Sequence, residues 1–138
     1  AGRPEEEIKA LFDFGDALGV AFQMVDDLLD YWGSEATGKN VGDDFRERKL
    51  TLPVIKAVAM ADAEERSFWS RTIEKGEQRD GDLDHALDLL HRHGTLDATR
   101  TEALAWAEKA KTAILTLPEN DLRDMLADLS DYVVARIN

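Results

Sequence analysis

The stretch FQMVDDLLDYW, residues 22–32, places three aspartates in a run that otherwise has the pattern of a buried helix. Like charges three and four residues apart on a helix repel each other, and carboxylates beside an apolar face lose hydration. At ~100° per residue, Asp26, Asp27, Asp30 and the preceding Gln23 share about a quarter-turn of one helix face. We therefore expect this line of carboxylates to be destabilising unless a cation lies against it.

Two interpretations of the aspartates follow from the residues alone. In the first, their oxygens bind Mg²⁺, which takes one or two carboxylates and fills its other positions with water or phosphate oxygens. In the second, they form a solvated face on an acidic protein. The three aspartates do not decide between the two interpretations.

A glycine-bearing loop with two lysines comes directly after the acidic helix end. The stretch TGKNVGDDFRERKLTLP, residues 37–53, carries Lys39 and Lys49, and Gly38 and Gly42 allow close approach of the backbone. Ammonium groups beside a carboxylate–Mg²⁺ cluster would neutralise the remaining oxygens of a phosphate ligand. For either lysine alone, solubility is the simpler explanation.

Taken together, GVAFQMVDDLLDY and TGKNVGDDFRERKLTLP resemble the second aspartate-rich motif and lysine loop of the trans-isoprenyl diphosphate synthase (polyprenyl synthetase) family. The family pattern is roughly F-Q-x-x-D-D-x-x-D, then G-K, G-x-D and K-x-T-x-P. The matching positions are Phe22, Gln23, Asp26, Asp27, Asp30, Gly38, Lys39, Gly42, Asp44, Lys49, Thr51 and Pro53.

The resemblance implies a prenyl-transfer reaction. In the family, two acidic motifs bind the diphosphate of an allylic substrate through three Mg²⁺ ions, and isopentenyl diphosphate attacks the allylic cation left after diphosphate departs. Asp26 is then expected to be the leading Mg²⁺ ligand, with Asp27 and Asp30 completing the cluster directly or through water. These three aspartates and Lys39 form the expected catalytic set.

The same resemblance implies substrate-binding roles for five residues. Lys39 and Lys49 would hold the allylic diphosphate, and Gln23 would bond to diphosphate or its water shell. Asp44 would support the ligands from behind. Phe22 would lie near the isopentenyl chain, although a core phenylalanine is the plainer interpretation for an aromatic on that helix.

Two features depart from the family pattern. Arg48 stands where many members have glycine, which predicts a stiffer loop and an extra cation facing the site. The first aspartate-rich motif and a Lys-Thr pair do not occur in these 138 residues. We therefore expect residues 1–138 to be the C-terminal portion of a single isoprenoid-synthase helical domain, inactive alone. The alternative explanation for a sequence that starts at Ala1 is that this residue is a processed natural N-terminus.

Rival functions remain from other classes. One is a non-catalytic helical subunit or scaffold of a heteromeric prenyl synthase, which would have no need for clustered carboxylates and lysines. Another is a class I terpene cyclase, but its N-S-E type of metal motif is missing. The style of residues 40–57 resembles long-chain, octaprenyl-type synthases that supply quinone side chains. The resemblance also implies a homodimer.

The rest of the chain predicts an all-α fold, an antiparallel helical bundle of the isoprenoid synthase type. Apolar residues recur at helical spacing from Pro4 to about Tyr31. Further helices are expected over residues 52–60, from an Asp62 cap to about Gly76, from Asp82 to Gly94, from a Thr95 cap to about Leu117, and through the C-terminus. The charged stretch at residues 74–84 is interpreted as a solvated turn.

The amino-acid composition and net charge limit the classes of partner and of metal site that this chain can bind. The net charge of −12 disfavours nucleic acid and anionic membrane surfaces. No apolar run approaches the ~20 residues that span a bilayer. The absence of cysteine excludes thiolate metal sites and fits a cytoplasmic protein. The three histidines lack metal-ligand spacing, so a zinc or di-iron site is not expected, and His93 is expected at a helix C-terminus.

Overall fold

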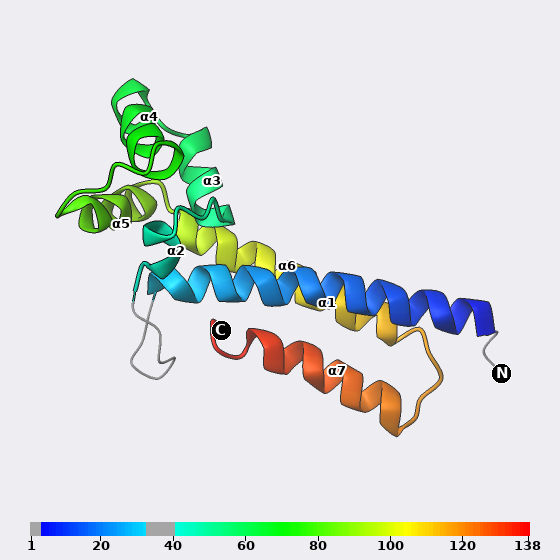
Figure 1. Cartoon of the computed structure of the whole chain (residues 1–138). Coiled ribbons are helices and arrows are strands. Elements are labelled where there is room, and N and C mark those ends of the chain that lie inside the picture. The colour runs from blue at the N-terminus through cyan, green and yellow to red at the C-terminus, as the bar shows by residue number, and fades with distance from the viewer. Residues whose placement is uncertain (1–3, 33–40) are drawn as a thin grey trace. The chain divides into compact units, whose positions relative to one another are not determined.

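The computed structural model describes residues 4–32 and 41–138, which form helices and contain no strand within those ranges (Figure 1). This confirms the all-α class. The elements are α1 (Pro4–Trp32), α2 (Asp43–Arg46), α3 (Leu52–Ala59), α4 (Ala63–Trp69), the π-helical turn η2 (Ser70–Glu74), α5 (Asp82–Arg92), α6 (Thr95–Ile114) and α7 (Asp121–Val134).

The chain divides into two compact units. One is formed by the chain up to Val25 together with Arg100–Asn138, and the other by Asp26–Thr99. Helices α1 and α6 contribute residues to both. The acidic end of α1 and the Lys49 loop therefore belong to the same unit.

Local capping signals fix several helix ends. The Asp62 carboxylate accepts the backbone N–H of Glu65 at 2.8 Å, as the spacing predicts. The cap predicted at Thr95 is wrong, because Thr95 is already the first residue of α6. Gly94, with φ +64°, precedes the helix, and its carbonyl accepts the N–H of Ala98 at 3.1 Å.

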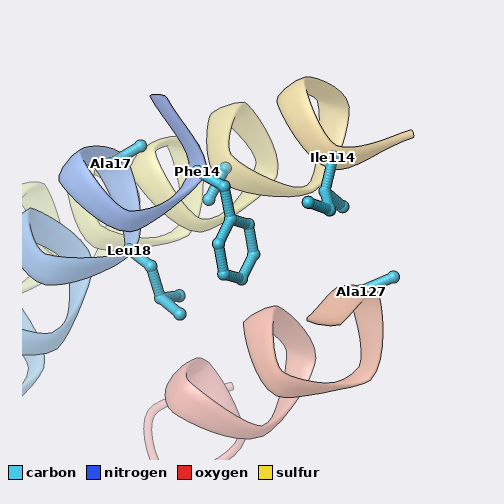
Figure 2. Close-up of a cluster of buried hydrophobic side chains, with 6 residues drawn as sticks. Phe14, Ala17, Leu18, Ile114 and Ala127 are labelled. Carbon is cyan, nitrogen blue, oxygen red and sulfur yellow. The ribbon is translucent and has the colours of Figure 1, made fainter. Parts of the chain in front are cut away.

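Three helices surround a core in the unit that holds both chain ends. There, α6 runs antiparallel to α1 and α7 (Figure 1). The Phe14 ring of α1 points toward the space between Ile114 of α6 and Ala127 of α7, and Leu18 of α1 belongs to the same buried cluster (Figure 2). Burying each large apolar side chain stabilises the fold by about 1.5–3 kcal/mol. This cluster therefore supplies much of the stability of the unit.

An aromatic cluster forms the core of the Asp26–Thr99 unit. Phe45 of α2 is 1% exposed and stacks on Phe68 of α4, with ring centroids 6.4 Å apart. Trp69 meets both rings edge-on, at 6.4 Å from Phe45 and 5.1 Å from Phe68. Trp69 is a core residue, since it is 3% exposed. These contacts fix α2, and with it the loop that precedes α3, against α4.

Large apolar side chains also lie on the surface of α1 and α7. The exposed ones on α1 are Ile8, Leu11, Phe12 and Phe22, and those on α7 are Leu122, Met125, Leu129 and Tyr132. Other apolar residues of α1, namely Phe14, Leu18, Val25 and Leu28, are buried within the chain. No helix among the described residues is long and apolar enough to cross a membrane.

Candidate functional site

The acidic residues at the end of α1 differ in their exposure. Asp26 is half-buried, whereas Asp27 and Asp30 are 9% and 1% exposed. The interpretation of the aspartates as a solvated face is therefore wrong for these two residues. Phe22 is 61% exposed, so the plainer interpretation of Phe22 as a core residue is also wrong in this structure. Gln23 is exposed.

Asp30 joins the end of α1 to the following loop. Its carboxylate accepts the backbone N–H of Asp44 at 3.1 Å, and its carbonyl accepts the N–H of Gly42 at 3.0 Å. Gly42 has φ +86°, and an added Cβ would lie 2.4 Å from a methyl carbon of Leu83. A residue with a Cβ would be strained in that conformation and would displace the Leu83 side chain. The buried carboxylate of Asp30 thus holds the start of α2 beside α1.

Asp44 continues this connection to Lys49. The Asp44 carbonyl accepts the backbone N–H of Lys49 at 2.8 Å, and its carboxylate lies 3.6 Å from the Lys49 ammonium. The Glu47 carboxylate is closer to that ammonium, at 2.9 Å. Both carboxylates, Glu47 first, raise the pKa of Lys49, so its charge is retained at neutral pH. A positive charge is thus linked to the acidic helix end through Asp44.

Arg48 does not turn its charge toward the acidic residues. Its guanidinium donates hydrogen bonds to the carbonyls of Ile73, at 3.0 Å, and Glu74. The expected extra cation facing the site is therefore wrong. The guanidinium binds the carbonyls at the end of η2 instead.

Two buried hydroxyls lie where α1 and the lysine loop meet. The hydroxyls of Tyr31 and Thr51 are buried, and neither makes a hydrogen bond of ordinary geometry to another described residue. Burial raises the pKa of the Tyr31 phenol well above its usual value, and the carboxylates of Asp30 and Asp44 raise it further, while the Thr51 hydroxyl acts in the opposite direction. Tyr31 is therefore a neutral group beside the acidic residues at neutral pH.

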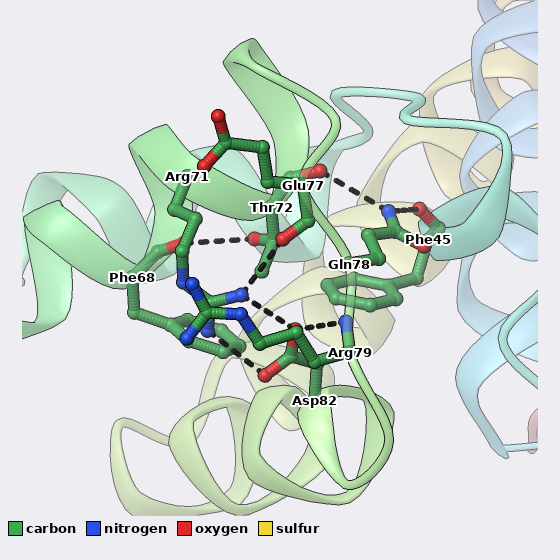
Figure 3. Close-up of polar contacts among 8 residues, drawn as sticks. All are labelled: Phe45, Phe68, Arg71, Thr72, Glu77, Gln78, Arg79 and Asp82. Atoms are coloured by element: carbon green, nitrogen blue, oxygen red, sulfur yellow. Dashed lines mark hydrogen bonds and ion pairs between the residues drawn. The ribbon is translucent and has the colours of Figure 1, made fainter.

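A network of polar contacts, not expected from the sequence, lies between η2 and α5 (Figure 3). Arg71 makes a two-pronged contact with Asp82, at 2.8 and 2.9 Å, and also donates to the Glu77 carbonyl at 2.7 Å. The Gln78 amide donates to the carbonyls of Phe45, at 2.7 Å, and Thr72, at 3.1 Å. The interpretation of residues 74–84 as a solvated turn is wrong for Gln78 and Asp82.

The same network perturbs the acidity of Asp82. The hydrogen bond from Arg71, supported by the backbone N–H of Arg79 at 2.7 Å, lowers the pKa of Asp82 in spite of partial burial. The sequence signals a compact turn here only through Gly76 and Gly81. Both glycines have positive φ in the structure. No periodicity connects Arg71 to Asp82, so spacing alone does not reveal this ion pair.

The residues at the end of α1 fit a Mg²⁺ ion in the chemistry of their donors. Among the described residues, no group of three His, Asp or Glu side chains is arranged to hold a metal alone. Mg²⁺ binds through one or two carboxylates together with water and phosphate oxygens, and the aspartates supply oxygen donors of that kind. Lys39 and Gly38 lie outside the described residues.

His93 ends α5 as expected, and its ring lies 2.8 Å from the Glu65 carboxylate.

Known proteins similar to this chain are prenyl synthases. Octaprenyl diphosphate synthases of Haemophilus influenzae and Escherichia coli are each 41% identical to it over 137 residues. Those alignments cover 99% of this chain but only 41% and 42% of the two relatives. The chain thus spans about two fifths of the length of these relatives.

Solved structures agree with this relationship. A decaprenyl diphosphate synthase from Rhodobacter capsulatus is 60% identical with a TM-score of 0.89, and the match covers 99% of this chain and 41% of that one. A Caulobacter crescentus polyprenyl synthase, complexed with calcium and isoprenyl diphosphate, is 45% identical with a TM-score of 0.86, covering 100% and 42%. The fold is therefore the all-α isoprenoid synthase fold.

The family model described as polyprenyl synthetase matches residues 1–90, which contain the acidic end of α1, the lysine loop and most of α5. That match covers well over half of the chain, and the chain belongs to the polyprenyl synthetase family.

Proposed function

We propose that this chain carries one Mg²⁺–diphosphate half-site of a trans-polyprenyl diphosphate synthase. The observation that carries the proposal is the connection Asp30–Asp44–Lys49, which joins the end of an acidic helix to a cationic loop within one unit. Carboxylates that attract a divalent cation, next to an ammonium, form a site for a diphosphate rather than for either ion alone. A related structure contains calcium and isoprenyl diphosphate, which supports this ligand class.

The proposed reaction condenses an allylic diphosphate with isopentenyl diphosphate. The allylic C–O bond breaks and releases diphosphate, a C–C bond forms to the double bond of isopentenyl diphosphate, and a proton is lost to restore a double bond. Three Mg²⁺ ions, as in the family, would neutralise the departing diphosphate. The opposing acidic motif would come from a part of the full-length enzyme not included in these residues.

Each proposed site residue has a role in binding or orientation. Asp26, the more accessible carboxylate, leads the metal ligands, with Asp27 beside it. Asp30 completes the cluster through water while its carboxylate also holds the Asp44 N–H. Lys49, with Lys39, binds the allylic diphosphate. Gln23 contacts diphosphate or its water shell, and exposed Phe22 lies near the isopentenyl chain.

Product and assembly are finer parts of the same proposal. Similarity to octaprenyl and decaprenyl diphosphate synthases supports a long-chain product. A homodimer, which is typical of the family, is proposed for the full-length enzyme. The cytoplasmic location expected from the sequence stays a prediction. A scaffold without catalytic activity is the less favoured function, because Asp26, Asp27 and Lys49 are all retained.

The test is a synthase assay with Mg²⁺, an allylic diphosphate and labelled isopentenyl diphosphate. A full-length enzyme containing this chain should elongate the substrate, and the 138-residue chain alone should not. Lys49→Ala should lower kcat/KM for the allylic diphosphate about 10- to 100-fold, because it removes a charge-assisted contact. The control Lys75→Ala removes an exposed lysine of the same unit. Equal activity of the two variants would refute the diphosphate role of Lys49.

A further inference from the structure

Arg48 has a backbone conformation that its residue type rarely adopts. Its φ is +63°, and among the described residues it is the one non-glycine with positive φ. L-amino acids with a Cβ are disfavoured in this left-handed region. An arginine here requires compensating contacts from the rest of the structure. Those contacts identify what the residue does.

The side chain of Arg48 supplies that compensation at the end of η2. Its Nε donates to the Ile73 carbonyl at 3.0 Å, and a second guanidinium nitrogen donates to the Glu74 carbonyl. Carbonyls at a helix end lack partners within the helix, so they accept such donors readily. Gly76, with φ +71°, lies against the same side chain, and an added Cβ there would be 2.8 Å from Nε.

The segment that receives Arg48 is itself held in place. Arg71 of η2 is bound to Asp82 of α5 by two contacts, at 2.8 and 2.9 Å (Figure 3). Gln78 then ties this segment to the Phe45 carbonyl at 2.7 Å. The residues from Phe45 to Arg48 are thus attached at both ends to a structure fixed against α5.

Lys49 follows immediately, and its direction depends on this attachment. The N–H of Arg48 donates to the Phe45 carbonyl at 3.0 Å, and the N–H of Lys49 donates to the Asp44 carbonyl at 2.8 Å. The Lys49 side chain is 59% exposed, so packing does not fix it. Its ammonium is held near Asp44 and Glu47 only while the backbone keeps this turn.

We propose that Arg48 is a positioning residue for Lys49, locking the turn that directs the Lys49 ammonium toward the diphosphate half-site. This inference rests on the proposed function. Arg48 acts through the η2 carbonyls and does not touch the substrate. Its loss therefore reduces the time that Lys49 spends in the binding orientation. The affinity for the allylic diphosphate therefore falls. The affinity for isopentenyl diphosphate and the rate of the chemical step change less.

The test compares Arg48→Ala, Arg48→Gly and Arg48→Lys with Arg46→Ala in the full-length enzyme. Arg46 is exposed, lies two residues earlier and pairs with the nearby Asp43 at 3.0 Å, so its variant removes the same charge without the attachment to η2. Arg48→Gly relieves the positive φ and so remains foldable if the alanine variant does not fold. Arg48→Lys retains one donor group and the charge, and it should rescue binding in part.

The expected result is a KM for the allylic diphosphate raised about three- to tenfold in the alanine and glycine variants, with kcat and the KM for isopentenyl diphosphate changed less than about twofold. Amide hydrogen exchange at Lys49 should accelerate in both variants and not in Arg46→Ala. The proposal would be overturned if the Arg48 variants had the same KM values and amide exchange as Arg46→Ala. It would also be overturned if they changed kcat and both KM values to the same extent.

The Lys49→Ala variant distinguishes a failure of this inference about Arg48 from a failure of the proposed function. If Lys49→Ala leaves the KM for the allylic diphosphate unchanged, the diphosphate role of Lys49 fails, and the positioning role of Arg48 in substrate binding fails with it. If Lys49→Ala raises that KM and the Arg48 variants do not, only the positioning role fails.

Discussion

The carboxylate of Asp30 accepts the backbone N–H of Asp44 at 3.1 Å, across 14 positions of sequence, while being only 1% exposed. This aspartate belongs to the motif that the sequence assigns to metal binding, yet it also supports the fold. The structural role of Asp30 and its proposed role in metal binding therefore need separate tests.

Asp30→Ala should destabilise the protein by about 1–3 kcal/mol, because the Asp44 N–H loses its acceptor inside the structure. Asp30→Asn keeps an acceptor oxygen of the same size and should retain most of that stability. Urea denaturation of both variants measures the difference. Equal stability of Asp30→Ala and the unmodified protein would show that the bond to Asp44 contributes nothing.

Replacing Asp26, in contrast to Asp30, should reduce activity and leave stability nearly unchanged. It is half-buried and is the proposed leading metal ligand, so Asp26→Ala should lower kcat of the full-length enzyme by about 100-fold or more with little change in melting temperature. Asp16→Ala, an exposed aspartate earlier on α1, is the matched control. Steady-state kinetics at saturating Mg²⁺ would detect the effect, and normal turnover of the Asp26 variant would remove it from the metal site.

Asp82 gives a prediction for pH dependence. Its pKa is lowered in the folded protein, chiefly by the hydrogen bond from Arg71. A lowered folded pKa means that the carboxylate stabilises the fold above its unfolded pKa of about 3.9, and that this stability is lost as pH falls through the folded value. Asp82→Asn should cost about 1–2 kcal/mol at neutral pH, and the difference should shrink below about pH 4.

The control for Asp82 is Asp80→Asn, which removes the same charge from an exposed position two residues earlier. Chemical denaturation at a series of pH values measures both variants. A stability difference for Asp82→Asn that stays constant into strong acid would mean that the ion pair with Arg71 is not its source.

Gly76 and Gly81 separate backbone strain from a clash with Arg48. Both have positive φ, +71° and +86°, but a Cβ at Gly81 would meet open space, whereas one at Gly76 would meet the Arg48 side chain. Gly81→Ala should cost about 1 kcal/mol from the backbone alone, and Gly76→Ala should cost more. In an Arg48→Ala background the excess at Gly76 should disappear, which a double-mutant cycle measures. Fully additive effects would contradict the contact.

Features that depend on neighbouring residues were predictable from the sequence. The helix from Pro4, the Asp62 cap and the start of α5 at Asp82 follow from periodicity and from residue preferences within one turn. The all-α class and the family follow from the same local patterns together with the spacing of the aspartates and lysines. These features required no knowledge of contacts between distant residues.

Features that depend on distant contacts were not predictable in this way. Arg48 bonds to carbonyls 25 and 26 residues away, so its charge could not be placed from the loop sequence. Gln78 reaches back 33 residues to Phe45, and for that reason a charged turn proved to be a structural connection. The burial of Asp27 and Asp30 likewise depends on elements packed around α1, which helical periodicity does not include.

Exposed apolar side chains on α1 predict that the 138-residue chain self-associates. Ile8 is 66% and Phe12 is 72% exposed, and they lie one turn apart on the same helix. Apolar patches of this kind on an isolated chain favour association. Replacing both residues with serine should weaken association, whereas replacing Leu122 and Met125 on α7 should not if α1 forms the contact. Sedimentation equilibrium at micromolar concentration measures this, and a compact monomer of 15.4 kDa for the unmodified chain would contradict the prediction.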